Sequence, residues 1–137
     1  MKKNVSIVVF YDKDKILLQD RKGISKYGEE FGFFGGHIEE GETPEQALKR
    51  EIEEELTFQL DNFKFFKKYG PKIYSDSPHE VTHFVFLAKI PRLSLFNQKE
   101  GDDMGLFTLD EAKKLRLVKA DYFIIDDLMK ILKSKSP

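Results

Sequence analysis

Apolar runs of two different periods divide the chain into predicted strands and helices. Residues 5–10 are apolar and rich in β-branched side chains, which predicts a buried strand, and residues 15–20 predict a second strand paired with the first. Residues 63–69 and 81–90 predict two further strands. Both alternating sides of the segment 81–90 are largely apolar, so we expect this strand to be covered on both faces.

One segment carries the signals of a well-defined helix. Thr43 suits the N-cap, Pro44 suits the first helical position and Gln46 completes a capping box. The helix is therefore predicted from Pro44 to about Leu56. At about 100° per residue, three apolar side chains form a narrow stripe on it. These are Leu48, Ile52 and Leu56.

The segments around this helix are shorter and less regular. Residues 31–34 form a short aromatic run, which we expect to end in a turn at Gly35 and Gly36. Residues 91–105 predict an irregular acidic loop, and residues 106–107 a short strand remnant.

Two helices are predicted near the C-terminus. Thr108 and Glu111 form a second capping box, and residues 121–132 form an amphipathic helix. Asp121 could contact a nucleobase edge, but its position favours an N-cap role. Strands mixed with helices predict an α/β fold, an α/β/α sandwich around a mixed sheet, with residues 1–137 as one domain.

Composition narrows the classes of partner. The 137 residues carry a formal net charge of -1, which gives no reason to expect binding to nucleic acid or to an acidic membrane. There is no cysteine, which excludes disulfides and thiolate chemistry. No stretch reaches membrane-spanning length, and the N-terminal apolar run is too short for a signal peptide. We therefore expect a cytoplasmic protein with no membrane partner.

Three carboxylates lie on one side of the predicted helix. Glu51, Glu54 and Glu55 are spaced at i, i+3 and i+4, and their arc adjoins the apolar stripe rather than facing directly away from it. Like charges this close repel each other, so we expect a cation among them. Mg²⁺ fits because it prefers oxygen ligands and often shares them with phosphates. The alternative is an acidic face that only contacts water.

A longer pattern surrounds these carboxylates. Gly36, then Glu42 after five residues, then the REIEEE run at residues 50–55 after seven more, resembles the signature of the Nudix hydrolases. At average residue usage such a match arises by chance roughly once in 10⁷ to 10⁸ positions. Two positions depart from the family pattern. Thr57 stands where the signature has glycine, and Phe34 where a proline often precedes the glycine pair.

The resemblance implies an enzyme that cleaves a diphosphate bond in a nucleoside diphosphate linked to a further group, with Mg²⁺ or Mn²⁺ as the cofactor. It implies that Glu42 and Arg50 brace the loop and orient the glutamates. The positions that it implies for metal binding are Gly35, through its backbone carbonyl, and Glu51, Glu54 and Glu55.

The loop near residue 100 resembles the one that supplies an extra glutamate in MutT-type members. Glu100 is the matching residue, and the resemblance implies that it is both a metal ligand and a catalytic residue. Asp102 or Asp103 could substitute for it. A general base must also take the proton of the attacking water. Glu54, Glu55 and Glu100 all stay open for that role, and the catalytic set implied is Arg50, Glu51, Glu54 and Glu100.

Substrate contacts are expected on both sides of the signature. Gly36 allows backbone to approach phosphate, Phe33 could stack on a base, and Arg21 could contact phosphate or base or be only a surface charge. Pro71 lies near the position where, in the resembled family, a proline marks ADP-ribose hydrolases. Tyr74 lies near the position where a tyrosine marks diadenosine polyphosphate hydrolases, so the two residues suggest different substrates.

The short chain and the loop near residue 100 favour a MutT-like nucleoside triphosphate pyrophosphohydrolase acting on a small-molecule nucleotide. Hydrolysis of ADP-ribose, dinucleoside polyphosphates or nucleotide sugars stays an alternative. So does a non-catalytic nucleotide-binding module of the same fold. The oligomeric state stays open.

Overall fold

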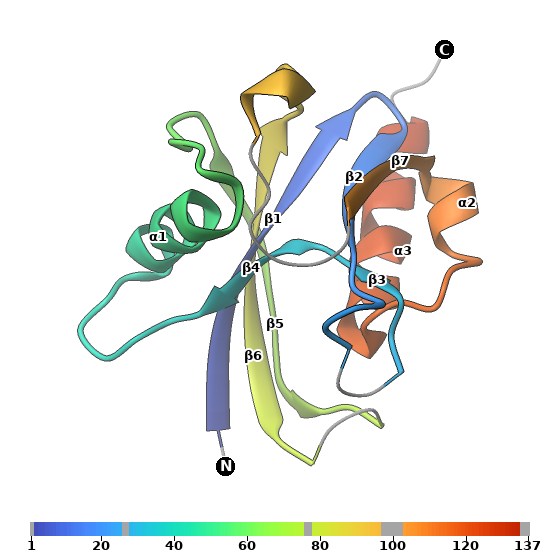
Figure 1. Cartoon of the computed structure of the whole chain (residues 1–137). Coiled ribbons are helices and arrows are strands. Elements are labelled where there is room, and N and C mark those ends of the chain that lie inside the picture. Colours follow the sequence, from blue (N-terminus) through green and yellow to red (C-terminus); the bar gives the residue numbers. More distant parts are fainter. Residues whose placement is uncertain (1, 26–27, 76–77, 97–102, 135–137) are drawn as a thin grey trace.

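The computed structural model describes residues 2–25, 28–75, 78–96 and 103–134. Within these ranges the chain forms a mixed sheet with helices on both faces (Figure 1), as the α/β/α prediction requires. The strands are β1 (Lys2–Asp12), β2 (Lys15–Asp20), β3 (Phe31–Gly32), β4 (Phe34–His37), β5 (Lys64–Ile73), β6 (Glu80–Lys89) and β7 (Asp103–Thr108). The helices are α1 (Pro44–Leu56), α2 (Leu109–Ala112) and α3 (Lys119–Ser134), with a 3-10 turn, η1, at Leu93–Leu95.

Strand β1 is the centre of the sheet. The strand order is β3-β2-β1-β6-β5, and β4 and β7 add to β1 and β2 off this path. β1 runs parallel to β6 and antiparallel to β2 and β4. The sheet is therefore mixed, and the short β4, which carries the glycine pair, lies directly beside the buried central strand.

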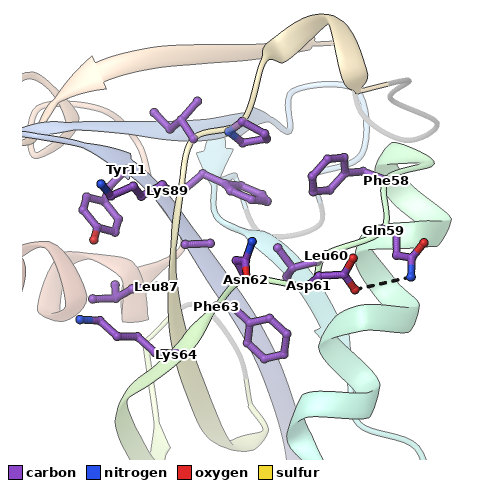
Figure 2. A pocket seen from close by; sticks show the side chains of 14 residues that line it. Tyr11, Phe58, Gln59, Leu60, Asp61, Asn62, Phe63, Lys64, Leu87 and Lys89 are labelled. Atoms are coloured by element: carbon purple, nitrogen blue, oxygen red, sulfur yellow. Dashed lines mark hydrogen bonds between the residues drawn. The ribbon is translucent and has the colours of Figure 1, made fainter.

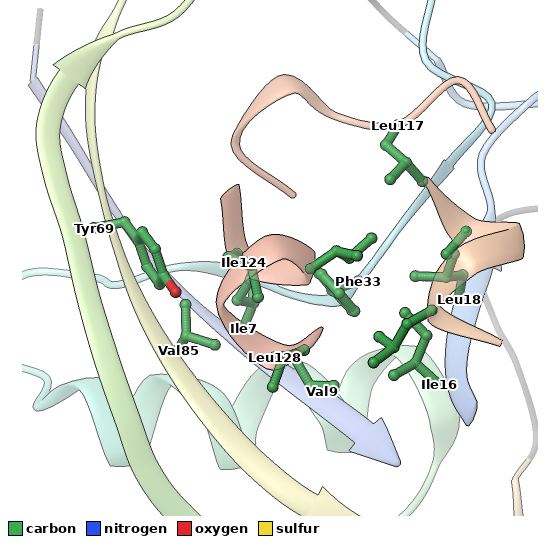
Figure 3. Packing of buried hydrophobic residues seen from close by; sticks show 13 residues of the cluster. Ile7, Val9, Ile16, Leu18, Phe33, Tyr69, Val85, Leu117, Ile124 and Leu128 are labelled. Carbon is green, nitrogen blue, oxygen red and sulfur yellow. The ribbon is translucent and has the colours of Figure 1, made fainter. Parts of the chain in front are cut away.

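Alternation along β1 separates two hydrophobic cores. Val8 and Phe10 pack on the face covered by α1, together with Phe34 and the apolar stripe of that helix. Ile7 and Val9 point to the opposite face and pack against α3 (Figure 3). Side chains of successive strand residues point to opposite faces, so one strand contributes to both layers.

Helix α1 has the predicted bounds and the predicted start. Thr43 accepts a hydrogen bond from the Gln46 N–H at 3.1 Å, and the Gln46 side chain accepts one from the Thr43 N–H at 3.0 Å. The stripe of Leu48, Ile52 and Leu56 is fully buried. The helix ends at Thr57, whose backbone is left-handed, with φ 50° and ψ 45°.

Two predicted boundaries were wrong. Gly35 and Gly36 do not form a turn after a strand over residues 31–34; they lie inside β4 and pair with β1. The strand remnant at residues 106–107 is part of a full strand, β7, that pairs with β2 along its whole length. In both cases pairing with a neighbouring strand, which local sequence does not show, extends the element.

None of the helices in the described part of the chain is both long enough and apolar enough to cross a membrane.

Candidate active site

Arg50 is the centre of the charged network on α1. Its Nε and Nη2 donate to the two carboxylate oxygens of Glu42 at 2.8 and 3.0 Å. Its Nη1 donates to Glu51 at 2.9 Å and lies 3.4 Å from the Glu54 carboxylate. Nη2 also donates to the backbone carbonyl of His37 at 2.9 Å. One guanidinium therefore ties the preceding loop and strand β4 to the acidic side of α1, as the resemblance implied.

The Glu42 carboxylate is held ionised by this network. Its bidentate bond with Arg50, together with a bond from the Glu39 N–H at 2.9 Å, lowers the pKa of Glu42 from 4.5 to about 2. The same bond raises the pKa of Arg50. Forked pairs of this kind combine charge with fixed geometry, so Glu42 and Arg50 form a rigid brace beneath the site.

The contact between Glu51 and β4 requires a residue without a side chain. A Cβ atom at Gly36 would lie 2.3 Å from the Glu51 carboxylate carbon, so the carboxylate packs directly against the Gly36 backbone. At Gly35 a Cβ would lie 2.1 Å from the Ser6 carbonyl oxygen, and φ is 150°. Gly36 therefore allows the Glu51 carboxylate to approach the backbone, and Gly35 allows β4 to approach β1, which any larger residue would prevent.

The other two glutamates of the arc differ in environment. Glu55 is buried, with 6% of its surface exposed, whereas the Glu54 side chain is 59% exposed. Glu51 lies between these extremes, at 18% for its side chain. The prediction that the arc lies at the edge of the buried face is confirmed, and its three members range from core to solvent.

The oxygen donors gathered here suit a hard divalent cation. Carboxylates and backbone carbonyls are the ligands that Mg²⁺ and Mn²⁺ prefer, and the bare Gly36 backbone leaves Glu51 close to the strand. Among the described residues no three acidic or histidine side chains already converge into a metal site. In this structure Glu51 and Glu54 point at Arg50 instead. Metal binding by Glu51, Glu54, Glu55 and the Gly35 carbonyl stays a prediction.

A cavity of about 390 Å³ opens beside the glutamates. Glu51, Glu55 and the Gly35-Gly36 backbone line one end of it. The remainder includes residues of β1, β6, the start of α3 and the segment between β2 and β3. The cavity therefore joins the acidic side of α1 to the opposite layer of the fold, with room for a small molecule.

Asp121 lies in this cavity and is not an N-cap. Helix α3 begins at Lys119, so Asp121 belongs to its first turn. Its side chain is only 3% exposed and accepts a hydrogen bond from the Phe33 N–H at 3.4 Å. The N-cap prediction was wrong because the helix starts two residues earlier, which leaves the carboxylate facing the β3–β4 segment.

Arg21 and Phe33 also line the cavity, and substrate contact by either residue stays a prediction. Phe33 is 6% exposed, and its ring belongs to the core that packs against α3 (Figure 3). Arg21 is held by two bonds, from Nε to Glu29 at 3.1 Å and from Nη1 to Gln19 at 3.0 Å. Arg21 is therefore a partly buried, oriented cation and not a free surface charge.

Sequence reasoning did not predict the burial of Glu29 or the place of Tyr74 in the cavity wall. Glu29 is 9% exposed and holds Arg21, but it lies in a polar loop whose local pattern does not indicate burial. Tyr74, on the far wall, stacks edge-on against His83 of β6. Nearby, burial and the charge of Lys3 lower the pKa of His79. The only signal for Tyr74 was its distance from the signature.

A second, larger cavity of about 740 Å³ lies away from the carboxylates. Figure 2 shows it between Phe58, Leu60 and Phe63, which follow α1, and the ends of the central strands. None of the four glutamates of the brace and arc lines it. Glu51, Glu55 and the Gly35-Gly36 backbone line the smaller cavity, so that cavity is the candidate active site.

The predicted extra glutamate falls outside the described part of the chain. Glu100 and Asp102 both lie outside the described residues. For Asp103 only the backbone is described, and it pairs with Asp20 of β2. The roles assigned to Glu100 therefore stay predictions.

The arrangement matches a known family. A family model described as the NUDIX domain matches residues 1–128. The chain belongs to the Nudix domain family. This Nudix domain is 38% identical over 91 residues to the 8-oxo-dGTP diphosphatase of Haemophilus influenzae, covering 66% of this chain and 59% of that protein. The alignment thus spans about three fifths of the length of that relative.

Two other similarities cover more of the Nudix domain. The 8-oxo-dGTP diphosphatase of Buchnera aphidicola is 27% identical over 131 residues, which cover 94% of this chain and 95% of that protein. The crystal structure of a MutT NUDIX hydrolase from Burkholderia pseudomallei superposes with a TM-score of 0.72 at 23% identity, covering 92% of this chain and 97% of that one. The second similarity supports the fold.

Proposed function

We propose that this Nudix domain hydrolyses a diphosphate bond of a nucleoside triphosphate, with Mg²⁺ or Mn²⁺ bound at the acidic side of α1. The observation that carries the proposal is the contact of Glu51 with the bare backbone of Gly36 at the rim of the 390 Å³ cavity. It brings a carboxylate, a strand backbone and a space for a nucleotide together in one place.

Different residues of the chain have different roles in the proposed reaction. Arg50 orients Glu51 and Glu54 from a fixed position because Glu42 and the His37 carbonyl hold its guanidinium. A bound divalent cation would neutralise phosphate oxygens and activate the attacking water. Water then attacks a phosphorus atom, the bond from that phosphorus to the bridging oxygen breaks, and a carboxylate takes the proton of the water. Glu54, Glu55 and Glu100 stay open for that last role.

The opposite wall of the cavity suits the nucleoside. The Asp121 carboxylate can accept hydrogen bonds from N–H groups on a base edge, such as those of guanine, and Arg21 can donate to phosphate or to base oxygens. Both side chains are held in place by neighbours, Asp121 by Phe33 and Arg21 by Glu29. The relatives named as 8-oxo-dGTP diphosphatases make that nucleotide the first substrate to test.

The test is a substrate panel with matched variants. Nucleoside triphosphates including 8-oxo-dGTP, dinucleoside polyphosphates, ADP-ribose and nucleotide sugars are assayed with Mg²⁺ and with Mn²⁺ for released phosphate or pyrophosphate. Glu54→Gln should lower the rate by about 100-fold or more, because it removes a ligand or a base. Glu53→Gln is the control, since its side chain is exposed on the same helix outside the predicted metal-binding arc.

Two results would overturn the proposal. One is an inactive wild-type chain across the panel with both metals. The other is equal rates for Glu54→Gln and Glu53→Gln. Tight binding of a nucleotide without any turnover would favour the non-catalytic module instead.

A further inference from the structure

Ser6 is a polar residue in an otherwise apolar row of the central strand. The residues of β1 that face α1 alternate as Ser6, Val8 and Phe10, and all three are fully buried. An apolar side chain would suit this position by burial alone. A buried hydroxyl needs a hydrogen-bond partner, so the partner indicates what this serine does.

That partner lies at the start of the helix that carries the glutamates. Ser6 Oγ donates to the backbone carbonyl of Pro44 at 2.8 Å. Pro44 is the first residue of α1, and the two residues are 38 positions apart in the chain. The bond therefore joins α1 to the sheet independently of the hydrophobic contacts between the two layers. Unlike those contacts, a hydrogen bond fixes a direction as well as a distance.

The backbone of Ser6 reaches the other half of the site. Ser6 pairs with Gly36 in the β1–β4 register, and its carbonyl oxygen packs against Gly35, where a Cβ would lie 2.1 Å away. Gly36 is in turn the residue against which Glu51 packs. One buried residue thus contacts both elements that present the predicted metal ligands, α1 through its hydroxyl and β4 through its backbone.

We propose that Ser6 is a positioning residue that sets α1 against β4 and so sets the separation between the Glu51 carboxylate and the Gly35-Gly36 backbone. Without its hydroxyl, α1 stays packed through its apolar stripe but can shift over the sheet. The metal ligands would then be present but misplaced. This inference rests on the proposed function because it assumes that those groups bind the metal.

Mn²⁺ binding to the substrate-free protein tests the inference, measured by electron paramagnetic resonance of the free ion. Ser6→Ala should weaken Mn²⁺ binding about tenfold, the lower end of the losses seen when groups that orient metal ligands are removed. Ser6→Thr, which keeps the hydroxyl, should restore most of the affinity. If Ser6→Ala does not fold, Ser6→Cys, with a similar size and a weaker donor, should show the loss.

Tyr69→Phe is the matched control. The Tyr69 hydroxyl is the donor of another long-range hydrogen bond, to Asp127 of α3 at 2.6 Å, and this residue does not line the cavity beside the glutamates. The control should lose stability and keep its affinity for Mn²⁺. In turnover assays at limiting metal, Ser6→Ala should lower kcat while the KM for nucleotide stays within about twofold, because Ser6 does not line that cavity either.

The possible outcomes distinguish a failure of the proposed function from a failure of the inference about Ser6. A wild-type chain that binds no Mn²⁺ would remove the proposed function and this inference together. A wild-type chain that binds Mn²⁺ no better than Ser6→Ala removes this inference alone. Equal losses in Ser6→Ala and Tyr69→Phe would reduce Ser6 to a stabilising contact, and equal losses in Ser6→Ala and Ser6→Thr would exclude a role for the hydroxyl.

Discussion

The left-handed backbone of Thr57, at the end of α1, leads to a direct prediction about stability. Thr57 has φ 50° and ψ 45°, close to the ideal left-handed values, and its N–H still donates to the Glu53 carbonyl at 3.0 Å. Threonine is β-branched and fits this conformation poorly, whereas glycine adopts it without strain. Thr57→Gly should therefore stabilise the protein while keeping the hydrogen bond that ends the helix.

Two opposing terms set the size of the gain. A left-handed conformation costs an ordinary residue roughly 1–2 kcal/mol, all of which glycine avoids. Glycine loses more backbone freedom on folding, which costs roughly 0.5–1 kcal/mol. The net stabilisation should be about 0.5–1 kcal/mol, and for a chain of 137 residues the midpoint of thermal unfolding should rise by about 2–4 °C.

Urea unfolding followed by circular dichroism measures this difference. Thr57→Ala is the matched control, because alanine removes the hydroxyl and methyl groups but keeps the Cβ that causes the strain. The alanine variant should be no more stable than wild type, and the glycine variant more stable than both. Equal stabilities of the two variants would refute the reasoning, since relief of backbone strain would then contribute nothing. Activity should be unchanged, because Thr57 does not line the cavity beside the glutamates.

Three further predictions concern the charged pairs of Arg50 and Arg21. Arg50→Lys should lower kcat by about 10- to 100-fold in steady-state assays, because lysine cannot form the fork that holds Glu42 while orienting the acidic side of α1; an unchanged rate would exclude that role. The pKa of Glu42 is lowered from 4.5 to about 2, so its stabilising pair is complete above pH 4.5 and is lost as the pH falls towards 2. Glu42→Gln should flatten acid unfolding measured over that range, and an unchanged acid profile would contradict the assignment. Glu29→Gln should raise the KM for nucleotide by about tenfold with a smaller change in kcat, since it releases Arg21; Michaelis–Menten kinetics that match wild type would argue against substrate contact by Arg21.

Much of the fold was predictable because it depends on local chemistry. The capping box, the early proline and the apolar stripe determine α1 to the residue, and largely apolar runs identify both central strands. The bounds of β4 and β7 were harder to predict from the sequence. β4 continues past the predicted end at Phe34, and β7 is longer than its local pattern indicates, because pairing with β1 and β2 stabilises residues, including three glycines, that have little strand preference of their own.

The candidate site likewise contains some groups that were predictable from the sequence and others that were not. The acidic arc and the brace of Glu42 and Arg50 lie within a few turns of one helix and its preceding loop, so residue spacing is enough to bring them together. Asp121 is different. It reaches the same cavity from α3 and bonds to Phe33, 88 positions earlier in the chain. Spacing along a helix carries no information about such a contact.

The sequence by itself therefore determined which groups this protein offers for the proposed chemistry on a diphosphate, because those groups are close in the chain and share a helix. Only the tertiary structure decided what those groups face. It placed Ser6 beneath both halves of the site, buried Asp121 and Glu29 in the cavity, and turned Arg21 from a strand-end charge into an oriented cation. Long-range packing makes these contacts, and it joins residues that the chain keeps far apart.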